Sequence, residues 1–228
     1  MINVFKNQLL SILYKEYRIL LNRIKSYLFA VLMGYAVILL IMWSVLKNSA
    51  VNVDSNNLLI LYSTVYMGFL SFLYAMRYWE EKITGTMEYS FVLNMSIRRI
   101  ILLKNIAYLI FGNVLLIIFF VISSVIFFQF SISNLLITII VYILLAFPYG
   151  LINGSGMWCL KSGAAKVLQL ISMGIIFSSI GIIWKVKDVN TIGYFLPLFL
   201  TFDGLLWIIS IILFLKADKE KAIVGISE

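Results

Sequence analysis

The amino-acid sequence predicts an all-α integral membrane protein, and three observations lead to that class. First, 63% of the residues are hydrophobic and only 12% are charged, whereas a soluble domain is about half apolar and a quarter charged. Second, six apolar runs are each long enough to cross a bilayer. Third, lysine and arginine concentrate in the segments on one side of those runs. Because polar surface is so scarce, most of the exterior must face lipid.

The six predicted spans form a single transmembrane domain, residues 1–228. A membrane-spanning helix needs about 20 mostly apolar residues. The runs that meet this requirement are residues 27–46, 58–76, 106–128, 135–159, 167–184 and 192–215. The fourth run is long enough to tilt, and Pro148 is expected to kink it.

The distribution of cations predicts which side of the membrane each loop faces. Five of the 18 Lys and Arg residues precede the first run, five lie between the second and third, two lie between the fourth and fifth, and three follow the sixth. Only Lys47, Lys185 and Lys187 fall on the other side. Cytoplasmic loops carry the excess of Lys and Arg in membrane proteins. Both termini are therefore expected in the cytoplasm, and the charge marks a membrane face rather than a nucleic-acid site.

Residues 1–26 are predicted to form an amphipathic helix rather than a span. The apolar residues that share one side are Phe5, Leu9, Leu13, Tyr17, Leu20 and Ile24, and the polar residues on another side are Lys15, Arg18, Asn22 and Lys25. Such a helix is suited to lie in the headgroup region. It either couples a cytoplasmic partner to the first span or serves as a simple interfacial anchor, and the pattern favours the two equally.

The loop of residues 77–105 interrupts the apolar character of the chain. Three of the ten carboxylates of the protein lie here, at Glu80, Glu81 and Glu88. Gly85 permits a turn. Thr86 is then placed to cap a short helix with Glu88 in its first turn, where the helix dipole favours a negative charge.

An apolar stripe follows on the same predicted short helix. Met87, Phe91 and Met95 recur at a spacing of four, and Ser96 is placed to cap the next helix. A helix this short is marginal in water unless it packs against something, and methionine suits an adaptable docking surface. The loop therefore predicts a docking site for a soluble partner, with a helical linker on the bilayer surface as the alternative.

The string EEKITGTME, from Glu80 to Glu88, with Ser96-Ile-Arg98 and Lys104 after it, resembles the coupling region of type-2 ABC-transporter permeases. The motif covers Glu80 to Lys104, and the six-span layout with an N-terminal amphipathic helix extends the resemblance to the whole chain. One difference is that Met95 stands where those permeases usually have a proline. The resemblance implies that residues 77–105 contain a coupling helix.

The resemblance further implies the membrane subunit of a bacterial ABC exporter in the cytoplasmic membrane. Two copies would pair as a homodimer, and each would seat its coupling helix in a cleft of a soluble ATP-binding subunit. ATP and magnesium would belong to that ATPase, because this chain has no G-x-x-x-x-G-K-[ST] loop. The glycine-rich stretch 150–156 lacks the lysine and lies inside the fourth span, where it indicates close helix packing. Apolar spans favour a hydrophobic or amphipathic peptide as the substrate, such as an antimicrobial or toxin-like peptide, with a lipophilic drug as a close second.

Three polar residues inside the spans are candidates for the substrate pathway. Asp203 is the only acidic residue well inside an apolar run, and such residues are functional candidates by default. It either caps a helix that begins at Leu205, after an external hairpin broken by Pro197, or acts in a pathway or gate. Asn113 and Asn153 either line a cavity or, as we expect more strongly, form hydrogen bonds between helices. Aromatic residues near the span ends, including Tyr78 and Trp158, are expected to form an interfacial belt.

The composition argues against other classes of function. The chain has no histidine and a single cysteine, so it lacks the commonest general base and metal ligand, and we expect no metal site. Without paired intramembrane carboxylates, it has no catalytic constellation of its own. The remaining alternative is a solitary immunity protein that binds or sequesters a peptide without ATP, a role that would leave the motif of Glu80 to Arg98 unexplained.

Overall fold

The computed structural model describes residues 2–22, 29, 32–36, 40, 66, 68, 73, 76–82, 95–126, 131–185 and 189–218. Over these residues the regular structure is entirely helical, as predicted. The long helices are α1 (Ile2–Asn22), α5 (Ile97–Ile126), α6 (Ile132–Cys159), α7 (Ser162–Lys185) and α8 (Val189–Lys216). Residues 32–36 and 76–82 form shorter helical segments.

Three of the described helices are long and apolar enough to cross a membrane. They are Ile97–Val125, Ile132–Cys159 and Leu196–Lys216, and Gly163–Ser179 is a shorter apolar helix within α7. Each overlaps one of the last four predicted spans, although Ile97–Val125 begins nine residues before the predicted span 106–128. Most of the first two predicted spans lies outside the described residues, as does the predicted coupling helix after Gly85. The chain is therefore a helical protein of membrane-spanning type.

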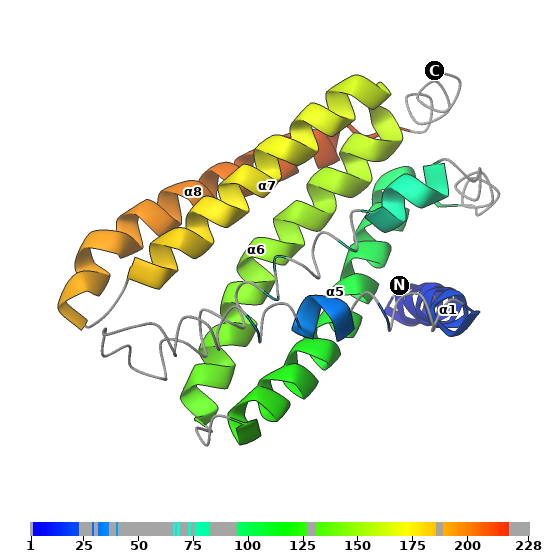
Figure 1. Ribbon diagram of the computed structural model, residues 1–228. Helices are drawn as coiled ribbons and strands as arrows, with labels where there is room; N and C mark the ends of the chain where they lie inside the picture. The colour runs from blue at the N-terminus through cyan, green and yellow to red at the C-terminus, as the bar shows by residue number, and fades with distance from the viewer. Residues whose placement is uncertain are drawn as a thin grey trace.

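The helices α5 to α8 form a bundle in which successive helices run in opposite directions (Figure 1). In this bundle α6 packs against α5, α7 and α8, while α7 also packs against α8. The amphipathic helix α1 contacts α5 near the N-terminal end of that helix. Every residue of α6 from Pro148 to Trp158 is buried, so this part of α6 is the axis of the bundle.

Side-chain caps define the starts of two helices. The Ser131 Oγ accepts a hydrogen bond from the backbone N–H of Asn134 at the start of α6. The Ser96 Oγ accepts one from the backbone N–H of Arg99 at the start of α5, which confirms the predicted cap. These bonds satisfy backbone donors that a helix leaves unpaired in its first turn.

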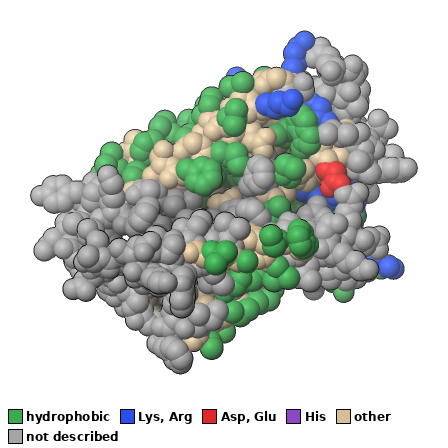
Figure 2. Space-filling model, in the orientation of Figure 1, with side chains coloured by type: hydrophobic (Ala, Val, Ile, Leu, Met, Phe, Trp, Pro, Cys, Tyr) green, Lys and Arg blue, Asp and Glu red, His purple; other side chains and the backbone are tan. Residues whose placement is uncertain are grey.

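The surface of the bundle is divided between apolar sides and a cationic end. Large apolar side chains are exposed along α5 to α8, and Figure 2 shows hydrophobic side chains over the visible sides of the bundle, with Lys and Arg gathered toward one end. That end carries the start of α5, the turn between α6 and α7, and the end of α8 (Figure 1). Apart from Lys185 at the far end of α7, the cations of the bundle lie together as the sequence predicted, and we call this part of the molecule the cationic end.

Candidate functional site

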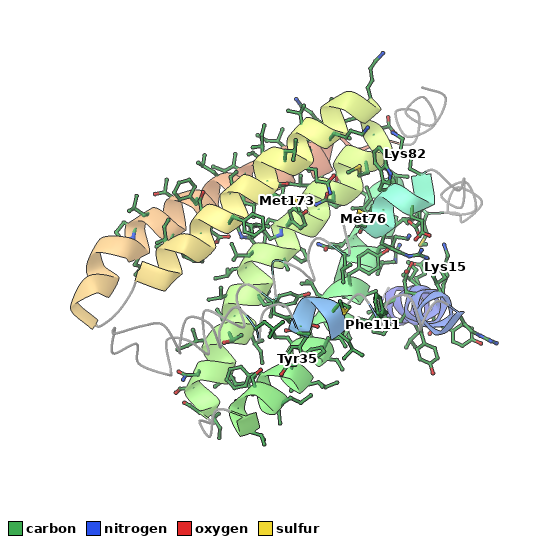
Figure 3. All side chains as sticks on the ribbon, viewed as in Figure 1. Lys15, Tyr35, Met76, Lys82, Phe111 and Met173 are labelled. Atoms are coloured by element: carbon green, nitrogen blue, oxygen red, sulfur yellow. The ribbon has the colours of Figure 1, made fainter. Side chains whose placement is uncertain are left out.

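Five charged side chains from three segments form an ion network at the cationic end. Helix α1 supplies Glu16, the helical segment 76–82 supplies Arg77, Glu80 and Glu81, and α5 supplies Lys104. Figure 3 shows these segments side by side, with Lys15 on α1 and with Met76 and Lys82 at the two ends of the short segment. The network thus joins the predicted amphipathic helix to both ends of the predicted coupling loop.

The contacts of the ion network run in a chain from one segment to the next. The Lys104 Nζ pairs with Glu81 Oε1 and lies 3.5 Å from Glu16 Oε1. The second oxygen of Glu16, Oε2, lies 3.7 Å from Arg77 Nε. The Arg77 guanidinium also donates to Glu80 Oε2 at 2.7 Å. Glu16 therefore bridges the two cations, and Lys104 bridges α1 to the short segment.

Burial makes this network different from a surface ion pair. Glu16, Glu81 and Lys104 are at most 2% exposed, and Arg77 is buried as well. The four buried groups comprise two anions and two cations, so their charges balance. Removing one partner from such a buried pair leaves an uncompensated charge and costs about 3–5 kcal/mol. The network therefore fixes these three segments relative to one another.

Two aromatic rings enclose the Lys104 ammonium group. Its Nζ lies 5.2 Å from the centre of the Trp158 ring and 5.8 Å from that of Tyr78. The two rings meet edge to face at 5.8 Å, and both residues are fully buried. Each ring face attracts a cation within about 6 Å. This burial corrects the predicted interfacial belt at Tyr78 and Trp158, because tight packing of α6 against the segment 76–82 removes both rings from the lipid boundary.

The network also changes the pKa of neighbouring groups. Burial lowers the pKa of Lys15, and the positive charge of Lys104 lowers it further. Burial and the negative charges of Glu81 and Glu16 raise the pKa of Tyr78 well above its usual value. Both shifts follow from low solvent access next to fixed charges. The tyrosine therefore stays neutral beside the network.

Glycine allows α6 to approach the network closely. A Cβ atom at Gly154 would lie 2.8 Å from Ile101 Cγ2 and 3.2 Å from the Tyr78 ring. At Gly150, a Cβ atom would lie 1.8 Å from Asn105 Oδ1. The same Asn105 donates from Nδ2 to the Phe147 carbonyl at 2.8 Å. The glycine-rich stretch therefore packs closely against α5, as small residues do at helix interfaces in membranes.

Further contacts tie the start of the predicted coupling loop to the rest of the cationic end. Lys82 Nζ donates to the Leu160 carbonyl at 3.1 Å, in the turn after α6. Lys166 of α7 lies 5.1 Å above the Trp79 ring. Arg98 Nε donates to the Ala217 carbonyl at 3.0 Å, at the end of α8. A displacement of this loop would therefore act on several helices of the bundle.

The structure brings together only part of the predicted coupling set. Glu81 is buried on Lys104, Glu80 is partly buried on Arg77, and Ser96 caps α5. Met95 packs partly buried against Ile12 of α1 and its neighbours on α5. Arg98 holds the end of α8. The remaining predicted residues lie outside the described residues: Gly85, Thr86, Met87, Glu88 and Phe91.

The sequence did not lead us to Glu16, the residue that α1 contributes to the ion network. Glu16 falls on a helical stripe with Leu9, Ile12 and Leu13, and this stripe faces α5. The sequence did contain a signal for Glu16, because an acidic residue on an otherwise apolar stripe becomes buried and then needs a cation as its partner. Asn105 was missed for a different reason. Its amide donates to the Phe147 carbonyl of α6, and α6 comes this close to α5 because Gly150 has no side chain.

The structure changes the interpretation of the three polar candidates within the spans. Helix α8 runs unbroken through Pro197 and Asp203, so Asp203 is inside a helix and the predicted cap at Leu205 is wrong. The amides of Asn113 and Asn153 donate to carbonyls one turn back in their own helices, at 2.9 and 2.8 Å. The expected bonds between helices are therefore not made by these donors, because the nearer backbone carbonyl competes for them.

No family model, curated protein or solved structure matches this chain. Function must therefore be argued from the site itself. The described part of the chain holds no group of three or more Cys, Asp or Glu residues placed to bind a metal. The site joins α1, the start of the predicted coupling loop and the helices of the bundle at one end of the molecule.

Proposed function

We propose that this chain is the permease subunit of an ATP-driven ABC exporter in a bacterial cytoplasmic membrane. Its six spans would place both termini in the cytoplasm, and two copies would form the translocation unit. A separate ATP-binding subunit would bind ATP and magnesium and would dock on the loop between the second and third spans. The substrate that best suits the apolar spans is a hydrophobic or amphipathic peptide.

The observation that carries the proposal is the ion network. Glu81 lies five residues after the end of the second predicted span, and Lys104 lies two residues before the start of the third. Their buried pair closes the base of the loop, and Glu16 adds α1 to the same unit. A loop that only rested on the bilayer would not need a base fixed by buried charges, since burying charge is costly.

In this proposal, movement of the ATPase subunits drives transport by displacing the helices of the permease. Closure of the paired ATPase subunits pushes the coupling loop, and the rigid base passes that displacement to α1, α5 and the adjoining end of α6. Two packings of the bundle with different access would then be favoured in turn by nucleotide. Glu81 and Lys104 have a positioning role here and do not touch the substrate.

Co-purification tests the docking step. The tagged chain would be expressed with each ATP-binding subunit of the same genome, extracted in mild detergent, and assayed for bound ATPase and ATP hydrolysis. We expect a stoichiometric complex with the wild-type chain. We expect its loss when residues 83–94 are scrambled, because this change removes the docking surface and leaves the ion network intact.

The matched control scrambles residues 48–57 in the loop between the first two spans, which the proposal places on the other side of the membrane. That variant should keep its ATPase. A wild-type chain that elutes without any ATPase, with and without nucleotide, would contradict the proposal and favour the solitary peptide-binding protein.

A further inference from the structure

Asp203 differs from the other polar residues of α5 to α8 because it is the one acidic residue in these four helices. Most of the others satisfy themselves by donating to a carbonyl of their own helix. Ser123, Ser124, Thr138, Asn153 and Ser179 each donate to the carbonyl four residues earlier, and Ser210 donates to the one three residues earlier. This arrangement requires a donor, and an ionised carboxylate has none. A protonated carboxyl has one O–H and fits the same pattern.

The surroundings of Asp203 are apolar and deep. The residue is 6% exposed, and its Oδ1 is buried without a hydrogen-bond partner among the described residues. The nearest residues on the buried side of α8 are Phe199 and Leu206. Thirteen residues separate Asp203 from Lys216, which at about 1.5 Å per residue puts the carboxyl roughly 20 Å from the cationic end.

The ion pairs of the described side chains do not include Asp203. On α7 the charged residues are Lys166 and Lys185. Ile176 packs beside Leu206, and α7 and α8 run in opposite directions (Figure 1), so along the helix axis Lys166 is roughly 20 Å and Lys185 about 9 Å from the level of Asp203. On α6 the titratable groups are Tyr142, Tyr149 and Cys159, and on α8 itself they are Tyr194 and Lys216. An isolated buried carboxylate is very costly, and a group in this position takes up a proton instead.

We propose that Asp203 is a proton-binding site, and that its carboxyl carries a proton while α8 is packed against α6 and α7. Separation of α8 from these helices admits water, and the proton then leaves the carboxyl oxygen for that water. Helix movement is thereby tied to uptake and release of a proton. This inference goes beyond the proposed function and holds with or without an ATPase partner.

Infrared spectroscopy of the full-length protein in hydrated lipid membranes tests the proposal directly. The spectrum of Asp203→Asn is subtracted from that of the wild type at neutral pH. We expect the carbonyl-stretch band of a protonated carboxylic acid, with loss of that band at alkaline pH. Carboxylate bands from Asp203 at neutral pH would overturn the proposal.

Two further measurements keep the result interpretable. The difference spectrum of Glu81→Gln should show carboxylate bands, because Glu81 is paired with Lys104. If Asp203→Asn fails to fold, the wild type labelled with ¹³C at its aspartate carboxyls replaces it. The chain has only four aspartates, and Asp54, Asp188 and Asp218 lie outside the apolar runs. One protonated-acid band shifted by the isotope supports the proposal, and carboxylate bands alone contradict it.

Discussion

The two halves of α6 differ in sequence and are covered in different ways. In the half that begins at Ile132, five large side chains are exposed: Ile132, Leu136, Ile137, Ile140 and Ile143. From Pro148 to Trp158 every residue is buried. The second half is rich in glycine and small polar residues, so neighbouring helices approach its backbone closely. The helix as a whole is long and apolar enough to cross a membrane, and the small residues of its second half allow protein rather than lipid to cover that half.

The two ends of the molecule also differ in how their polar and charged groups are paired. At the cationic end, Glu16, Arg77, Glu81 and Lys104 are buried in pairs. Nearer the other end the polar groups are neutral: Ser123 and Ser124 donate to carbonyls of α5, and the Ser123 hydroxyl also lies 3.2 Å from the Tyr35 hydroxyl. One end of the molecule is thus held together by buried ion pairs, while the other is joined by neutral hydrogen bonds and by ring contacts such as that of Tyr35 with Phe119. The following substitutions test that contrast.

The largest effect is expected from removing the central cation of the ion network. The substitution Lys104→Met leaves two buried carboxylates, Glu81 and Glu16, without the ammonium group that both of them contact. The free energy of unfolding should fall by about 3–5 kcal/mol, measured by chemical unfolding in detergent micelles with circular dichroism.

The matched control is Lys166→Met, which removes an exposed cation above Trp79 and should cost about 1 kcal/mol or less. The double variant Lys104→Met with Glu81→Gln should recover part of the lost stability. Equal losses for Lys104→Met and Lys166→Met would show that the network does not hold the cationic end together.

A pair of equal truncations on α6 compares its two halves directly. Ile152 is 1% exposed and packs against Tyr149, Ile176 and Leu206, so Ile152→Ala should cost about 2–5 kcal/mol. Ile143 is 42% exposed, and Ile143→Ala should stay within about 0.5 kcal/mol. Denaturant titration of both variants gives the comparison. A large loss at Ile143 would mean that protein rather than lipid covers this position.

Glycine packing should give a smaller loss. In Gly150→Ala the new Cβ would overlap Asn105 Oδ1, and relief of that clash should cost about 1–3 kcal/mol. Gly174→Ala is the control, because nothing lies within 4 Å of a Cβ there. It should be neutral or stabilising by up to about 1 kcal/mol. Thermal unfolding of the two variants measures the difference in stability. Adding Asn105→Ala to Gly150→Ala should restore part of the lost stability.

The smallest effect concerns Lys15 and pH. Its pKa is lower in the folded protein than the ordinary value of 10.5, so the unfolded chain binds the proton more tightly. Stability should therefore rise with pH as Lys15 loses its proton in the folded state, up to about the unfolded pKa. Lys15→Gln should flatten this rise relative to the wild type in melting curves measured at stepped pH. Identical slopes would contradict the shift.

The sequence predicts those interactions of the candidate site whose partners lie close together along the chain, and it does not predict those whose partners lie far apart. The Ser96 cap and the helix of α1 follow from residues a few positions apart, and the structure confirms both. The pair of Glu81 and Lys104 spans 23 positions, and Glu16 is much farther away along the chain. Helical periodicity cannot match such partners. The interpretation of Asp203 as a cap failed because a local Pro and Asp–Gly signal was outweighed by the packing of α8 against α6 and α7.

The sequence by itself determined the class of the protein, the approximate helix boundaries of the last four spans and the gathering of cations at one end. These features depend on hydropathy summed over about 20 residues and on charge at the ends of apolar runs. Only the tertiary structure decided which polar groups meet. Close approach at Gly150 and Gly154 brings α6 against α5 and the segment 76–82, and that contact encloses Lys104 between two rings. Buried charges must be paired in space, and the spacing of residues along a chain does not specify the partner.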